Sequence, residues 1–165
     1  MTKLRILIGD ITQSDADIIV FSAHPSLLAG SGVSGAIHQA AGKELEAGAR
    51  EFAPLKVGEA IITPAFELKS KYVIHTVCPR YIYGTDQEKE LLARAYKSAL
   101  NLHETVADAD SIAFISMGTG IYRWPLIEAS KIAVGCILGS NLPQTMMYVT
   151  DKLTKEAYEN AILSV

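Results

Sequence analysis

Two glycine-rich segments and one acidic residue have the chemistry to hold a phosphorylated ligand. Gly30-Ser-Gly-Val-Ser-Gly35 runs into a predicted helix, and Met117-Gly118-Thr119-Gly120 lies between a predicted strand and the helix expected near Pro125. Glycine lets the backbone approach a ligand closely, and the free N–H groups of a helix N-terminus attract an anion. Asp10 adds a carboxylate, which is an acceptor only. Together the loops could hold a diphosphate, although each alone could also be a tight strand-to-helix connection.

The position of the first glycine segment argues against a Rossmann dinucleotide site. The segment matches GxGxxG literally, but in a Rossmann unit the first glycine follows the strand at once. Here the preceding strand is expected to end near Ser22, and residues 24–29 intervene before Gly30. The first strand of the chain ends in Gly9-Asp10 instead. The segment therefore predicts another kind of loop.

The elements that must position these loops alternate between strands and helices. Apolar and β-branched runs predict strands at 4–8, 18–21, 60–63, 72–77, 111–115 and 146–149. Helical spacing predicts helices over 33–41, around 45–52, over 85–106, from 125 to 137 and after 151. This alternation predicts an α/β fold with a mostly parallel sheet covered on both faces. Because ligands bind outside the carboxyl ends of such strands, we expect the site at Gly9-Asp10, in the loop 22–35 and in the loop 116–124.

Length and composition set further bounds on the protein. Its 165 residues fit one domain, residues 1–165. Its formal net charge is -3 and its sequence has no run of Lys or Arg that would form a basic face, so we expect no nucleic-acid partner. The apolar runs are strand-sized, which argues against a membrane partner. Cys78 and Cys136 form no CxxC pair, and no His or Cys spacing suggests a metal or cofactor. With no signal-peptide segment at the start, these features predict a cytoplasmic location.

Short motifs in a fixed order extend over nearly the whole chain. They are Gly9-Asp10-Ile11-Thr12, the segments 15–20, 25–38, 58–63 and 71–77, and Gly118-Thr-Gly-Ile-Tyr122 with Pro125-Leu126. Each is weak alone, but the ordered set resembles the macro domain family. The resemblance implies a three-layer α/β/α sandwich with a mixed, mostly parallel sheet of about six strands, and a cleft that binds ADP-ribose or an ADP-ribosyl group. It also implies two alternatives: a hydrolase of O-acetyl-ADP-ribose or protein-linked ADP-ribose, or a pocket retuned to another nucleotide.

The resemblance implies roles for individual residues. Asp10 would accept a hydrogen bond from the adenine amino group, and Tyr122 would lie beside the distal ribose. The whole ligand-binding set comprises Asp10, Ile11 and Ala23, the first phosphate loop Gly30, Gly32, Val33 and Ser34, and the second loop Gly118, Thr119, Gly120, Ile121 and Tyr122. An ADP-ribosylated protein is a further expected partner.

Departures from the family pattern leave catalysis open. Hydrolytic members carry Asn-Ala-Ala-Asn after the second strand, where this chain has Phe21-Ser-Ala-His24, and Ser34 replaces an Asp proposed to activate water. Serine is a poor general base at neutral pH, whereas a histidine titrates near neutrality. Three interpretations stay open: binding without catalysis, catalysis with His24 as base, and substrate-assisted chemistry with no dedicated base. The candidate catalytic residues are His24 and Ser34.

Other positions are less decisive. Thr150 stands where family members place an aromatic residue that stacks on the base, which predicts a weaker adenine contact. Arg123 could meet a phosphate, and Trp124 could be a lid or pack at the helix start. We interpret His38 and His75 as core histidines whose ring nitrogens are hydrogen-bonded.

Overall fold

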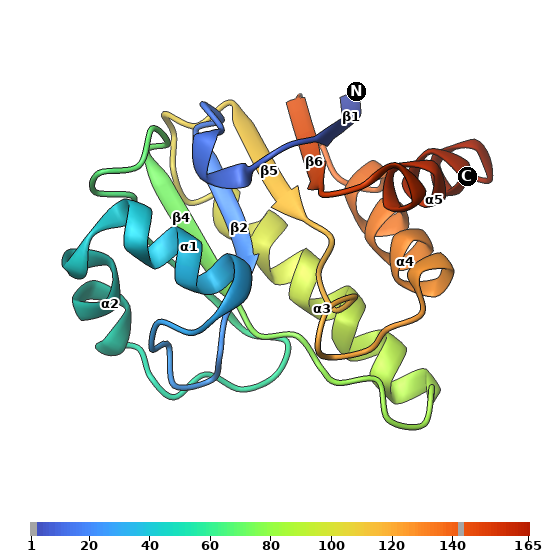
Figure 1. Ribbon diagram of the computed structural model, residues 1–165, viewed down its shortest axis with the longest axis horizontal. Coiled ribbons are helices and arrows are strands. Elements are labelled where there is room, and N and C mark those ends of the chain that lie inside the picture. The colour runs from blue at the N-terminus through green and yellow to red at the C-terminus, as the bar shows by residue number, and fades with distance from the viewer. Residues whose placement is uncertain (1–2, 142–143) are drawn as a thin grey trace.

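A six-stranded mixed sheet forms the centre of the molecule (Figure 1). The computed structural model describes residues 3–141 and 144–165. The strands are β1 (Lys3–Ile8), β2 (Ile18–Ser22), β3 (Ala60–Pro64), β4 (Tyr72–Thr76), β5 (Ser111–Ile115) and β6 (Gln144–Val149). Their order is β1-β6-β5-β2-β4-β3; β3 is antiparallel to β4 and the other neighbours are parallel. The predicted α/β fold with a mostly parallel, six-stranded mixed sheet is confirmed.

Helices cover both faces of the sheet (Figure 1). One face carries α1 (Gly32–Ala41), α2 (Lys43–Arg50) and the short 3₁₀ turn η1 (Ile11–Gln13), and the other carries α3 (Asp86–His103), α4 (Leu126–Leu138) and α5 (Lys152–Leu163). Consecutive side chains of β2 pack into opposite cores. Ile18 and Val20 pack on the side of α3–α5, and Ile19 and Phe21 pack on the side of α1 and α2. This explains the uninterrupted apolar run. Within the described part of the chain, no helix is long and apolar enough to span a membrane.

The ends of the helices follow their local signals in most cases. The Asp151 carboxylate accepts a hydrogen bond from the Thr154 N–H at 2.7 Å and begins α5. The expected helix around 45–52 ends earlier, at Arg50, and Phe52 is half exposed instead of facing the core. Pro54 disfavours the helical conformation of the residue before it, so the chain leaves the helix ahead of it.

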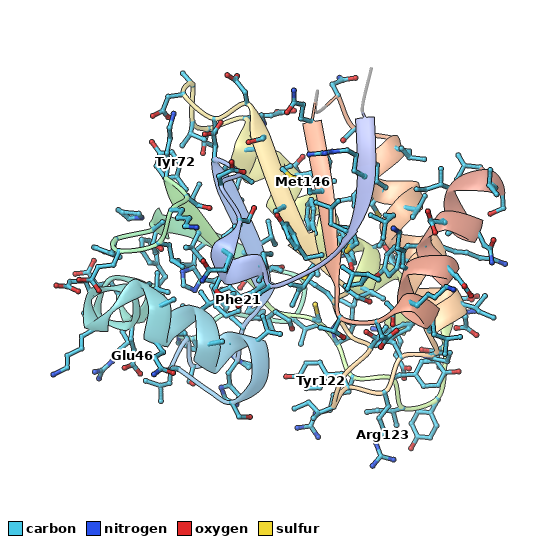
Figure 2. All side chains as sticks on the ribbon, turned by 45° about the horizontal axis from the view of Figure 1, so that its top comes forward. Phe21, Glu46, Tyr72, Tyr122, Arg123 and Met146 are labelled. Carbon is cyan, nitrogen blue, oxygen red and sulfur yellow. The ribbon has the colours of Figure 1, made fainter. Side chains whose placement is uncertain are left out.

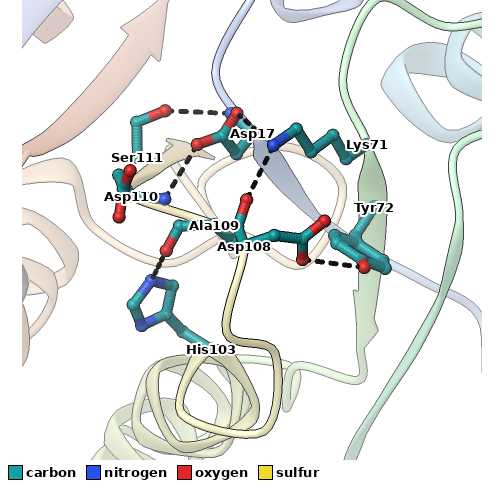
Figure 3. Close-up of polar contacts among 8 residues, drawn as sticks. All are labelled: Asp17, Lys71, Tyr72, His103, Asp108, Ala109, Asp110 and Ser111. Atoms are coloured by element: carbon teal, nitrogen blue, oxygen red, sulfur yellow. Dashed lines mark hydrogen bonds and ion pairs between the residues drawn. The ribbon is translucent and has the colours of Figure 1, made fainter.

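A polar network holds the amino ends of the strands together (Figure 3). The Asp17 carboxylate accepts a hydrogen bond from the Asp110 N–H at 2.8 Å and lies 3.8 Å from the Lys71 ammonium. Lys71 also donates to the Asp108 carbonyl at 2.7 Å, and the Tyr72 hydroxyl donates to the Asp108 carboxylate at 3.0 Å. These contacts fasten the loop before β5 to β2 and β4. The polar groups of this edge therefore stabilise the fold, and the loops with ligand chemistry lie at the opposite edge.

Candidate functional site

A cavity of about 530 Å³ opens at the carboxyl ends of β1, β5 and β6. This volume falls in the range of roughly 300–1,000 Å³ that small-molecule sites occupy. The cavity lies where open α/β sheets bind their ligands. The residues that line it are Gly9, Asp10, Ile11, Thr12, Val33, Ala36, Ile115, Ser116, Thr119, Gly120, Trp124, Leu126, Tyr148, Val149, Thr150, Asp151 and Thr154.

A larger groove of about 890 Å³ lies between α3 and α4. Its lining includes residues 104, 106, 107, 109 and 110 after α3 and residues 139–141 after α4, so it faces the C-terminal ends of both helices. Helix C-termini carry partial negative charge and repel anions. The smaller cavity, which adjoins the N-terminus of α1, therefore suits a phosphorylated ligand better.

Asp10 lies at the rim of the 530 Å³ cavity with one carboxylate oxygen free. The Gly9 N–H donates to the Val149 carbonyl at 3.0 Å and fixes the turn beside the end of β6. Oδ1 of Asp10 accepts hydrogen bonds from the Thr12 N–H at 2.9 Å and the Thr12 hydroxyl at 2.7 Å. Among the described residues, nothing donates to Oδ2 of this exposed side chain. The carboxylate is thus oriented by its local turn and keeps an acceptor for a ligand.

The first glycine segment places the open end of α1 beside the cavity. Ser31 is the residue before the helix, but its side chain makes no capping hydrogen bond. The first N–H groups of α1 are consequently left to solvent or to a ligand. Val33, in the first turn, lines the cavity. This arrangement can receive an anionic group.

Two buried tyrosines support the base of the second glycine loop. The Tyr158 hydroxyl donates to Ser116 Oγ at 2.7 Å, and Ser116 Oγ lies 2.9 Å from Thr119 Oγ1. The Tyr96 hydroxyl accepts from the Met117 N–H at 3.0 Å. Burial raises the pKa of Tyr158 to about 12 and the pKa of Tyr96 well above its ordinary value, so both hydroxyls stay protonated. The loop is thereby held in one conformation before any ligand arrives.

Trp124, at the end of the second glycine loop, is a buried packing residue. Its side chain is 3% exposed, its indole N–H donates to the Pro79 carbonyl at 2.9 Å, and its backbone N–H donates to the Gly118 carbonyl at 2.9 Å. Gly118 has φ +89°, and a Cβ there would lie 2.7 Å from the Trp124 ring. Of the two interpretations of Trp124, packing is the one the contacts support. Figure 2 shows Tyr122 and Arg123 projecting outward from this loop.

The predicted ligand-binding residues fall into two groups. Those that line the 530 Å³ cavity are Asp10, Ile11, Val33, Thr119 and Gly120. Those that lie on the same loops outside its lining are Ala23, Gly30, Gly32, Ser34, Gly118, Ile121 and Tyr122, with His24 beyond them.

Tyr148 is a cavity residue that the sequence reasoning missed. It lies on β6, two residues before Thr150, and both residues line the cavity. Its ring lies beside Gly9, where a Cβ would be 3.5 Å from Cδ1 and Cε1. The missing aromatic at position 150 therefore does not leave the cavity without a ring. The two-residue period, applied backward from Thr150, is the signal that could have found it.

Phe21, at the position of the first family asparagine, lies in the interior of the molecule (Figure 2), where its ring contacts two histidines. It is fully buried and meets the His38 ring edge-on at 5.9 Å and the His75 ring at 5.0 Å. His75 Nε2 lies 3.0 Å from Thr63 Oγ1, whose hydroxyl donates to the Pro64 carbonyl. Nδ1 of both histidines is buried without a hydrogen-bond partner among the described residues. The expectation that their ring nitrogens are hydrogen-bonded was thus wrong for Nδ1, because Phe21 offers no polar atom.

Acid should destabilise the folded protein through His38 and His75. Burial, with repulsion from His38 second, lowers the pKa of His75 from 6.5 to about 3, and burial also lowers the pKa of His38. Between pH 3 and 6.5 the unfolded chain binds more protons at position 75, so stability falls as pH falls through that window. At pH 5 the loss from His75 should be about 2 kcal/mol relative to pH 8. Denaturant unfolding at both pH values measures it.

The matched variants are His75→Gln, which keeps an N–H donor for Thr63, and His24→Gln at an exposed histidine. We expect His75→Gln to flatten the pH dependence and His24→Gln to preserve it. Equal slopes for wild type and His75→Gln would contradict the assignment.

His24 lies in a local turn. Its Nδ1 accepts a hydrogen bond from the Ser26 N–H at 3.0 Å and lies 2.7 Å from Ser26 Oγ. A ring nitrogen that accepts a hydrogen bond carries no proton, so the proton of the neutral ring lies on Nε2. The ring then has no free lone pair with which to act as a base. Among the described residues, no group of three or more His, Cys, Asp or Glu side chains could hold a metal.

Comparison with known proteins identifies the fold and the family. The model of the Macro domain family matches residues 20–133. A macro domain-containing protein of Mesorhizobium japonicum is 41% identical over all of this chain and 96% of its own length. An O-acetyl-ADP-ribose deacetylase of Cronobacter turicensis is 44% identical over 79% of this chain and 76% of its own.

The solved structures agree with the sequence relatives. The macrodomain of Oceanobacillus iheyensis, solved with ADP, superposes with a TM-score of 0.91 at 36% identity, covering 98% of this chain and 90% of that one. A mutant of it, solved with ADPR, gives the same TM-score. The fold of this chain thus recurs in a solved macrodomain. The chain belongs to the macro domain family.

Proposed function

We propose that this chain binds ADP-ribose or an ADP-ribosyl group in the 530 Å³ cavity. The observation that carries the proposal is the meeting of an acceptor, Asp10, with the uncapped start of α1 and the rigid loop 116–120 around one cavity. Asp10 Oδ2 would accept from the adenine amino group, and Tyr148 would pack near the base. The diphosphate would lie between the first turn of α1 and residues 118–120. The relatives solved with ADP and ADPR support this choice of ligand.

Calorimetric titration with ADP-ribose, ADP and AMP tests the proposal. The distal ribose should add contacts with residues 118–122, so we expect ADP-ribose to bind at least roughly tenfold tighter than ADP, about 1.4 kcal/mol. AMP, which lacks the second phosphate, should bind more weakly than ADP. Equal affinities for ADP and ADP-ribose would remove the distal-ribose part of the proposal. Absence of any binding would overturn the whole of it.

Hydrolysis of O-acetyl-ADP-ribose or of protein-linked ADP-ribose is the second candidate, supported by the 44% identity to a protein named O-acetyl-ADP-ribose deacetylase. Against a base at His24 stand its turn contacts with Ser26 and its position outside the cavity lining. The first turn of α1, which contains Ser34, has no acidic residue that could take the place of the family Asp. An assay for acetate release by wild type and His24→Ala separates the candidates. Turnover in wild type that His24→Ala abolishes, with binding retained, would establish the hydrolase; no turnover in wild type would leave the binding function alone.

The remaining expectations belong to the same proposal. We place the protein in the cytoplasm, because Cys78 and Cys136 are free thiols and burial raises the pKa of Cys78 to about 12, which keeps it inert. The net charge of -3 argues against nucleic acid or an anionic membrane surface as a partner. Residues 1–165 act as one domain, since both cores share the single sheet.

A further inference from the structure

We propose that a rigid ledge beside the cavity binds the protein that carries the ADP-ribosyl group, through an acidic segment of that protein with an apolar side chain. The ledge consists of residues 80–84 and residues 121–123. The inference rests on the proposed function, because it concerns what is attached to the bound ADP-ribosyl group.

One carboxylate binds the backbone of three successive residues in the segment 80–84. Glu88 accepts hydrogen bonds from the N–H groups of Ile82 at 3.0 Å, Tyr83 at 3.1 Å and Gly84 at 2.9 Å. The Thr85 hydroxyl in turn accepts from the Glu88 N–H at 3.1 Å and caps α3. The backbone from Ile82 to Gly84 is therefore fastened to the helix that follows it.

The two halves of the ledge are joined to each other. The Tyr81 N–H donates to the Tyr122 carbonyl at 2.9 Å. The Tyr81 ring meets the buried Trp124 ring edge-on at 5.1 Å, and the Arg80 guanidinium lies 5.6 Å from the centre of the Tyr122 ring. The loops thus form one surface, although they are far apart in sequence.

This surface exposes large apolar side chains that the fold does not use. Ile82 is 63% exposed, Tyr83 is 83% exposed and Ile121 is 89% exposed. Exposed apolar groups that cluster on a fixed backbone mark interaction sites, and tyrosine and arginine are the residues that dominate binding energy at interfaces. Because the backbone is already ordered, a partner would lose little entropy by docking here.

The charge of the ledge selects the chemistry of the partner. Arg80 and Arg123 are both exposed, and residues 79–85 and 116–125 contain no Asp or Glu, in a chain of net charge -3. The Glu88 carboxylate already accepts backbone hydrogen bonds, and Asp86 is the first residue of α3, after the Thr85 cap. An acidic segment complements this surface. Two cations with aliphatic neighbours fit a polypeptide better than a nucleic acid, whose binders line up more cations along the backbone.

The ledge adjoins the cavity through the second glycine loop. Thr119 and Gly120 line the cavity, and Ile121 to Arg123 follow directly along the chain. Figure 2 shows Tyr122 and Arg123 at the edge of the molecule opposite Tyr72, which begins β4. A ligand that enters between the two glycine loops therefore has the ledge beside its exit.

Two probes test the inference with purified chain: free ADP-ribose, and a peptide rich in Glu and Leu that carries ADP-ribose through a hydrolysis-resistant linkage. The variants are Tyr83→Ser and Ile82→Glu, whose exposed side chains lie outside the proposed nucleotide contacts. Matched controls are Leu163→Ser, an equally exposed apolar residue at the end of α5, and Lys131→Glu on α4. We expect each ledge variant to weaken peptide binding roughly tenfold, to leave ADP-ribose binding unchanged, and both controls to behave as wild type.

The outcomes separate the two proposals. No binding of ADP-ribose by wild type would defeat the proposed function itself. If ADP-ribose binds but the modified peptide binds no tighter, or if the ledge variants leave peptide binding unchanged, the ledge has no docking role and the inference is overturned. A Gln-for-Glu peptide that binds as tightly, or a single-stranded oligonucleotide that competes for the ledge, would also overturn it, because the partner would then not be an acidic protein.

Discussion

Replacing Asp10 with asparagine is expected to weaken ADP-ribose binding roughly 10- to 100-fold while leaving the fold intact. Asparagine retains an oxygen that can accept from Thr12, so the turn at the start of η1 survives. The oxygen left free, Oδ2, becomes an N–H₂ donor that would face the adenine amino group, also a donor. A charge-assisted hydrogen bond is thus replaced by a clash of donors.

Titration of Asp10→Asn and Asp10→Ala together distinguishes recognition from structure. Alanine removes both the free acceptor and the turn contact, so it should lower affinity and also stability. A variant at the opposite edge, Asp17→Asn, should alter stability without altering affinity. An Asp10→Asn protein that binds ADP-ribose as wild type does would mean that adenine is not bound at Asp10.

Gly35→Ala is expected to disrupt the first glycine loop. A Cβ at Gly35 would clash with the Gly30 carbonyl oxygen, a backbone atom that cannot rotate away. Either the loop or the first turn of α1 must shift, and overpacking of this kind costs roughly 1–3 kcal/mol. Since Val33 lies in that same turn and lines the cavity, we expect roughly tenfold weaker ADP-ribose binding as well. Chemical unfolding and titration of the same preparation measure both effects.

The control for this substitution is Gly135→Ala in α4. Apart from the backbone of α4 itself, no atom of the described residues lies within 4 Å of a Cβ at Gly135. Alanine is also the better helix former, so the variant should gain up to about 1 kcal/mol. If Gly35→Ala instead folds and binds as wild type does, residues 30–35 do not form the close-packed loop that the proposal requires.

The fold was predictable because local signals and the sheet agree along most of the chain. The run 18–21 predicted a strand covered on both faces, and β2 has a core on each side. The last strand was expected at 146–149 and begins earlier, at Gln144, because its exposed start lacks an apolar signal. The prediction that the second helix extends to Phe52 was wrong, because the apolar spacing continues past Arg50, where the helix ends ahead of Pro54.

The site was predictable in chemistry more than in geometry. Gly9-Asp10 and residues 118–120 carry their signal in residue type, and Asp10, Thr119 and Gly120 line the cavity. Tyr148 was not predicted as a cavity residue, because the sequence does not show which face of the sheet a strand side chain points to. The Tyr158 to Ser116 hydrogen bond joins α5 to the loop after β5, and no local pattern reports a contact between segments so far apart. His24 had a catalytic residue type, but only the structure reveals that Ser26 occupies its Nδ1.

A crystal structure of the chain with ADP-ribose tests the central claim most directly. We predict the adenine amino group within about 3 Å of the Asp10 carboxylate, the diphosphate between the first turn of α1 and residues 118–120, and the distal ribose beside Tyr122. A nucleotide bound in the groove between α3 and α4, or with its adenine away from Asp10, would contradict the account.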